Sequence, residues 1–176
     1  MRGLLGFLGL AAVAGLLTAA TLSSADDKKD DKKEEKAEKI APDKLPQKIK
    51  DAIEGRFPKA EITSAEKEKE DGKIVYDIEL KHEGRKYEMD ILEDGTIIEI
   101  EKEVKLKDLP AAVAAALKAK FPDATIKEIM EVNKVKDKKE TPDHYEVTIV
   151  GKDKKEKEVI VSLDGKSIKG EKEEKK

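Results

Sequence analysis

Six acidic residues occupy alternating positions in three short segments of the chain. In extended strands, residues two apart point to the same face, so all six would share one side of a sheet. The set comprises Asp77, Glu79, Glu88, Asp90, Glu99 and Glu101. Carboxylates gathered on one face suit two kinds of recognition: docking of a basic protein surface, and binding of divalent cations. Like charges on neighbouring strands cost about 0.2–1 kcal/mol per pair, so such a face needs lysines, salt or a partner to offset it.

The residue types that catalysis requires are scarce. There is no Cys, which excludes disulfides, thiol catalysis and thiolate metal sites. His82 and His144 have no second ligand or base at short spacing, so we interpret both as exposed structural residues. The sequence contains no serine elbow, phosphate-binding loop, dinucleotide fingerprint or calcium loop. We therefore expect a protein that is not an enzyme and carries no cofactor.

The charge balance narrows the classes of partner that the protein could bind. Charged residues make up 44% of the 176 residues, yet the formal net charge is only −3. The charges of opposite sign nearly cancel and form no basic stripe, so no nucleic-acid partner is expected. Apolar residues gather in short periodic segments, which makes a modest core feasible despite this charge.

The elements that position the acidic residues occur twice. Leu-Pro followed by Phe-Pro appears at 45–58 and again at 109–122, a repeat of about 65 residues. Proline is tolerated in the first turn of a helix and ends a helix elsewhere, so each pair brackets a helix. Apolar residues every four positions give each helix one buried stripe. The stripes are Leu45, Ile49, Ile53 and Phe57 in the first copy, and Leu109, Val113, Leu117 and Phe121 in the second.

Strands follow each predicted helix. Apolar and polar residues alternate around Tyr76 and Tyr145, and each copy ends with an Asp-Gly hairpin signal, at 94–95 and 164–165. We expect an α+β fold of two tandem repeats, each one helix followed by an antiparallel meander of about four strands. The pattern leaves open whether the two meanders join into one larger sheet. Both tyrosines are expected in the core, and residues 133–142 are expected to form a longer charged loop.

These features together resemble the PepSY-like family, which is described as β-lactamase-inhibitor-like. The resemblance rests on the Leu-Pro helix start, the Phe-Pro helix end, the tyrosine in the second strand, the Asp-Gly hairpin, and the glutamate that follows it (Glu101, Glu171). It covers residues 45 to about 173. The resemblance implies an exported bacterial protein that binds, or inhibits, another protein such as a peptidase or other hydrolase of the envelope.

The N-terminus is typical of an export signal. Arg2 precedes an apolar stretch over 3–22, and small residues at 23 and 25 place a cleavage site after Ala25. We expect a signal peptide over 1–25, a charged disordered linker over 26–42, and PepSY-like repeats over 43–105 and 106–173. Cleavage predicts a periplasmic or secreted protein without stable membrane insertion. An uncleaved segment over 3–22 would instead serve as an anchor.

Two hypotheses follow from the sequence. In the first, a protein partner in the envelope docks on the six acidic residues. In the second, the same face binds divalent cations weakly, or the protein has a structural role in the envelope.

Overall fold

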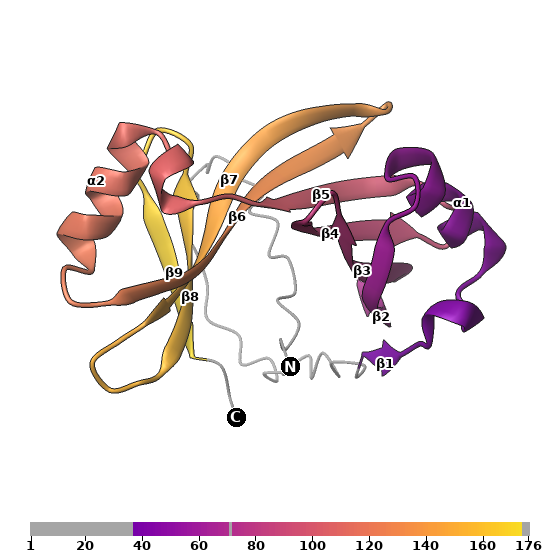
Figure 1. Cartoon of the computed structure of the whole chain (residues 1–176), viewed down its shortest axis with the longest axis horizontal. Coiled ribbons are helices and arrows are strands. Elements are labelled where there is room, and N and C mark those ends of the chain that lie inside the picture. Colours follow the sequence, from indigo (N-terminus) through magenta and orange to yellow (C-terminus); the bar gives the residue numbers. More distant parts are fainter. Residues whose placement is uncertain (1–36, 71, 174–176) are drawn as a thin grey trace, which may run out of the picture.

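The computed structural model describes residues 37–70 and 72–173, and its strands form one antiparallel sheet in chain order (Figure 1). The elements in order are β1 (Glu38–Lys39), the 3-10 helix η1 (Pro42–Lys44), α1 (Gln47–Arg56), β2 (Glu61–Glu70), β3 (Lys73–His82), β4 (Arg85–Leu92), β5 (Ile97–Glu103), the 3-10 helix η2 (Leu106–Asp108), α2 (Ala111–Lys120), β6 (Thr125–Lys136), β7 (Lys139–Val150), β8 (Glu156–Ser162) and β9 (Ile168–Glu173).

The expected α+β class and the doubling of the chain are confirmed. Within the described residues there are two α-helices; α1 precedes β2–β5, and α2 precedes β6–β9. The question of one sheet or two is answered by β5 and β6, which pair from Glu99↔Lys134 to Glu103↔Met130. The nine-stranded sheet is therefore continuous across the two repeats.

Each helix begins and ends where the prolines predict. Pro46 and Pro110 stand at the N-caps, and the backbone N–H groups of Phe57 and Phe121 donate to the fourth residue before them. The next residue is proline in both copies and cannot continue the helix. Seven of the eight residues in the predicted stripes are buried; the exception, Phe121, is partly buried at the margin of the second core.

Both helices cover the same face of the sheet. The first core joins the α1 stripe to Tyr76 and Ile78, and the second joins the α2 stripe to Tyr145 and Val147. The alternation continues through β5 and β6, where Ile100 of the first core lies opposite Asn133. In Figure 1 the sheet arches between the two helices, which lie on its outer side. We call the other side, which carries the acidic residues, the open face.

The Asp-Gly hairpin of each repeat lies close against the helix of that repeat. Gly165 has φ 70°, and a Cβ there would come within 2.7 Å of the carbonyl oxygen of Ala112 in α2. Gly95 occupies the equivalent place beside Lys48 of α1, with φ 90° and 3.1 Å from a Cβ to that carbonyl oxygen. Glycine is required at both positions because the backbone is left-handed and the helix lies so close.

The expected charged loop over 133–142 is wrong. Residues 125–136 and 139–150 form a long hairpin, with Lys136 opposite Lys139 and a turn at Asp137 and Lys138. Both turn residues have positive φ, 52° and 63°, the conformation of a tight primed turn. Pro142 fits into β7 because β8 pairs with that strand only as far as His144 and the register with β6 shifts beside it.

The predicted linker over 26–42 also differs at its end. Glu38–Lys39 forms a short edge strand on β2, where Glu38 faces Lys67 and Lys39 faces Glu66, so opposite charges pair. The predicted signal peptide and its cleavage site lie outside the described residues. Among the residues that are described, none of the helices is long and apolar enough to cross a membrane.

Candidate functional site

The open face brings all six predicted acidic residues together in two rows across the strands. In the first acidic row, Glu66, Asp77, Asp90 and Glu99 lie opposite one another in sequence on β2, β3, β4 and β5. The second acidic row comprises Glu79, Glu88 and Glu101 on β3, β4 and β5. Neighbouring strands are about 4.8 Å apart, so each carboxylate faces a like charge on at least one side.

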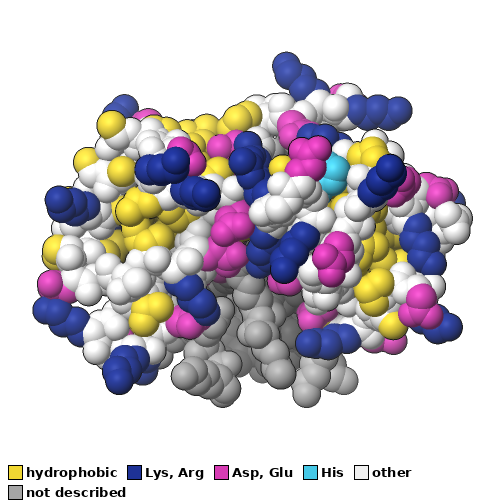
Figure 2. Space-filling model, in the orientation of Figure 1, with side chains coloured by type: hydrophobic (Ala, Val, Ile, Leu, Met, Phe, Trp, Pro, Cys, Tyr) yellow, Lys and Arg dark blue, Asp and Glu magenta, His cyan; other side chains and the backbone are white. Residues whose placement is uncertain are grey.

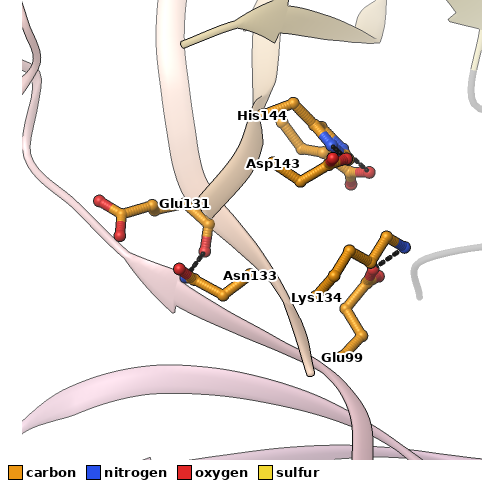
Figure 3. Close-up of polar contacts among 7 residues, drawn as sticks. Glu99, Glu131, Asn133, Lys134, Asp143 and His144 are labelled. Carbon is orange, nitrogen blue, oxygen red and sulfur yellow. Dashed lines mark hydrogen bonds and ion pairs between the residues drawn. The ribbon is translucent and has the colours of Figure 1, made fainter. Parts of the chain in front are cut away.

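Three lysines offset part of this charge, and the first of them, Lys39, has its Nζ 3.7 Å from Glu66 Oε1 in the first acidic row. Lys86 Nζ lies 2.8 Å from Glu88 Oε1, 3.2 Å from Glu128 Oε1 and 3.7 Å from Glu79 Oε1. Lys134 donates to Glu99, which is only 5% exposed (Figure 3). Lys39 and Lys134 lie at the two ends of the first acidic row, and Lys86 lies on β4 beside the second row. An ammonium group is thus a ligand that these carboxylates already accept within the protein.

At the centre of the two rows, carboxyl groups lie close to one another without a lysine between them. Burial and the nearby carboxylates of Glu99 and Asp77 raise the pKa of Asp90 to about 8. Burial and the charges of Glu146 and Glu88 raise the pKa of Glu101 well above its ordinary value. For Glu99, the rise in pKa caused by burial exceeds the opposing effect of its bond to Lys134. These carboxyl groups therefore keep their protons to a higher pH than isolated carboxyl groups do.

A raised pKa is also found on β2, next to the edge strand β1. Glu68 is 8% exposed and lies on the open face beside Glu66 and Glu70. Burial and the neighbouring carboxylate of Glu70 raise the pKa of Glu68 to about 7. Glu68 was outside the predicted set, although its spacing of two from Glu66 and Glu70 was readable in the sequence.

His144 is not the exposed residue that was expected. It is 6% exposed on the open face of β7, with Nδ1 2.7 Å from Asp143 Oδ2 and Nε2 3.2 Å from Glu146 Oε1 (Figure 3). Burial lowers the pKa of His144, but the hydrogen bonds to Glu146 and Asp143 outweigh it, so the net shift is upward. The two carboxylates therefore favour the protonated form of the imidazole. His82, by contrast, stacks near Phe57 and Tyr87 on the helix side, with ring centroids 5.5 and 6.5 Å apart.

The acidic rows do not form a metal cage. In residues 37–70 and 72–173 no group of three carboxylate or histidine side chains is arranged to hold a metal ion. Across the rest of the visible surface, acidic and basic side chains are interspersed, and hydrophobic ones gather at the end of the molecule that carries α2 (Figure 2). The arrangement on the open face is that of a charged surface with a few internal cations.

A family profile matches two overlapping segments of the chain, residues 27–99 and 76–169. The chain belongs to the family described as "Putative beta-lactamase-inhibitor-like, PepSY-like". The double match of this PepSY-like family agrees with the two repeats seen in the fold. A comparison with curated proteins finds no match to the sequence.

Solved structures share the fold of this PepSY-like chain. A BLIP-like protein from Bacteroides fragilis is 20% identical and has a TM-score of 0.51, with 75% of this chain and 89% of that chain covered. A DUF2874 family protein from Bacteroides uniformis is 12% identical and has a TM-score of 0.57, with 73% and 89% covered. A protein from Bacteroides eggerthii, described as periplasmic, is 15% identical and has the same TM-score, with 73% and 88% covered.

Proposed function

We propose that the open face docks a basic surface of a protein partner in the bacterial envelope. The observation that carries the proposal is the alignment of six predicted carboxylates in two rows on the face opposite α1 and α2. Such an arrangement costs stability, because like charges face one another across every strand pair of the first acidic row. A basic partner would relieve that cost on binding.

The chemistry of the partner follows from the cations already present. Lys86 is held among three glutamates, and Lys134 by Glu99. These internal contacts support a partner that presents lysine or arginine side chains. The side chains would be spaced to reach the carboxylates of Asp90 in the first acidic row and Glu101 in the second. Charge complementarity would raise the association rate and make binding sensitive to salt.

The family supports the remainder of the proposal. Its description as inhibitor-like favours a protein that acts by binding and not by catalysis. The similar structure described as periplasmic favours an exported protein. Bound to an envelope hydrolase such as a peptidase, the chain would inhibit it by covering the region around its active site.

The test compares two variants of the mature chain, residues 26–176, in which the same number of carboxylates is replaced. The first replaces four carboxylates of the rows: D77N, E79Q, E88Q and D90N. The control replaces four exposed aspartates elsewhere: D43N, D51N, D108N and D123N. Both are used beside the wild type in crosslinking capture from the envelope fraction of the source bacterium, followed by affinity measurement at two salt concentrations.

A partner captured by the wild type and the control, with affinity for the first variant lower by about tenfold or more, supports the open face as the docking surface. Equal affinity of all three proteins places binding elsewhere. If the partner is a hydrolase, its activity with and without the wild-type chain tests inhibition separately from docking.

A further inference from the structure

The hairpin formed by β6 and β7 extends past both of its neighbours. β5 pairs with β6 only as far as Glu99↔Lys134, and β8 pairs with β7 only as far as His144↔Ser162. Beyond those pairs the hairpin continues as a two-stranded ribbon to the turn at Asp137 and Lys138. In Figure 1 this ribbon reaches from the second repeat over the end of the first that carries α1.

The ribbon is attached to the first repeat by two contacts of different kinds. Val135 packs against the first core, the one built on α1. Arg56, at the end of α1, donates from Nε and Nη2 to Glu140 Oε1 at 2.9 and 2.5 Å. The Arg56 guanidinium also lies 4.9 Å from the centroid of the Phe57 ring, which limits the positions that its head can take. Two donors that converge on one carboxylate oxygen fix the orientation of the guanidinium group as well as attracting it.

The attachment matters because, apart from the ion pair of Lys86 with Glu128, the two repeats otherwise meet along a single strand pair. The pairing of β5 with β6 spans five residue pairs. The line between these two strands is the one about which the two halves of the sheet can twist relative to each other. A contact made some distance from that line resists the twisting. The same line runs through the open face, between Glu99 and Glu101 on β5 and Lys134 on β6.

We propose that the β6–β7 hairpin is a strap from the second repeat to the first, which fixes the angle between the two halves of the open face. Val135 supplies the apolar attachment, and the Arg56–Glu140 pair keeps the tip in place. The importance of that angle for partner binding rests on the proposed function, whereas the coupling of the two repeats does not.

The absence of Cys from the chain makes the geometry directly measurable. Spin labels on Asp51→Cys in α1 and Ala115→Cys in α2 report the distance between the two helices, and both positions are exposed. In the otherwise unchanged protein, pulsed electron resonance is expected to give one narrow distance distribution. Arg56→Gln and Val135→Ser, separately and together, should broaden or shift it, and the exchanged pair Arg56→Glu with Glu140→Arg should restore it.

The control breaks an ion pair that lies within one repeat. Asp123→Asn removes the partner of Lys152 in the second repeat, at 2.9 Å, and should leave the distribution unchanged. Circular dichroism first establishes that each variant is folded, and Glu140→Gln replaces any variant that is not. A distribution that stays the same in all strap variants would overturn the proposal. Because no partner is present, this outcome is independent of whether the open face docks a protein.

Discussion

Asp90 is the residue whose removal should most clearly reveal the repulsion on the open face. It lies between Asp77 and Glu99 in the first acidic row, and its pKa is raised to about 8. Asp90→Asn keeps the shape of the side chain and removes the charge. We expect the variant to be more stable than the wild type at pH 8 and to differ much less at pH 5.

The sign and size follow from proton linkage. In the unfolded chain an aspartate has a pKa of about 3.9. A pKa raised on folding contributes stability that is fully present below pH 4 and is lost as pH rises to about 8. Each pH unit within that window is worth about 1.4 kcal/mol, so three units give a ceiling of about 4 kcal/mol. Structural relaxation and water penetration reduce such penalties, so we expect a loss of about 2 kcal/mol between pH 5 and pH 8.

Urea unfolding at pH 5, 6, 7 and 8 measures this difference. With a denaturant slope of about 1–2 kcal/mol per molar, the wild type should lose about 1–2 M in its midpoint relative to Asp90→Asn across that range. Asp108→Asn, an exposed aspartate in η2, serves as the control and should follow the wild type. Parallel curves for the wild type and Asp90→Asn would refute the reasoning, because the carboxylate would then ionise as easily in the folded protein as in the unfolded chain.

Three further outcomes are expected. Gly165→Ala should lower the free energy of unfolding by about 2–4 kcal/mol, because the left-handed backbone and the contact with α2 both oppose a Cβ. Gly84→Ala, with φ 76° and open space around it, should cost only about 1–2 kcal/mol in the same denaturation assay. Lys134→Met should lower the free energy of unfolding by about 1–3 kcal/mol at pH 8, because it leaves the Glu99 carboxylate without its lysine. Adding Glu99→Gln to this variant should recover most of the loss. If it does not, the lysine acts through other contacts. In an NMR titration the pKa of the His144 imidazole should lie above 6.5, so that its contribution to stability is full below pH 6.5 and is lost as pH rises through the raised pKa. A pKa at or below 6.5 would contradict the contacts seen with its two carboxylates.

Periodicity and proline placement were enough to predict the helices, most of the core and the acidic face. Leu45, Ile49 and Ile53 repeat every four residues, and nothing in the tertiary structure competes with burying that stripe. The acidic residues alternate strictly, so their common face follows once the segments are strands. The pairing that places Asp77, Asp90 and Glu99 in one row depends on a register that the Asp-Gly turn alone does not specify.

Other features depended on information that short patterns lack. The turn at Asp137 and Lys138 contains no glycine, and Pro142 argues against a strand, so the β6–β7 hairpin resembled a loop. The role of Lys134 comes from pairing between β5 and β6, which are separated in sequence by α2. Both carboxylates beside His144 are its neighbours in sequence, but its burial depends on the strands that pair with β7.

The short strand β1 has a consequence for how the molecule behaves at high concentration. An open sheet ends in strands whose backbone groups are free to recruit another chain, and this is a common origin of aggregation. β1 pairs only with residues 66–67 of β2. This part of β2 carries Glu66 and Glu68 on one face of the sheet and Lys67 and Lys69 on the other. A chain added at that edge would have to strip water from charges on both of its sides. High protein concentration would therefore not readily add a further chain at this edge of the sheet.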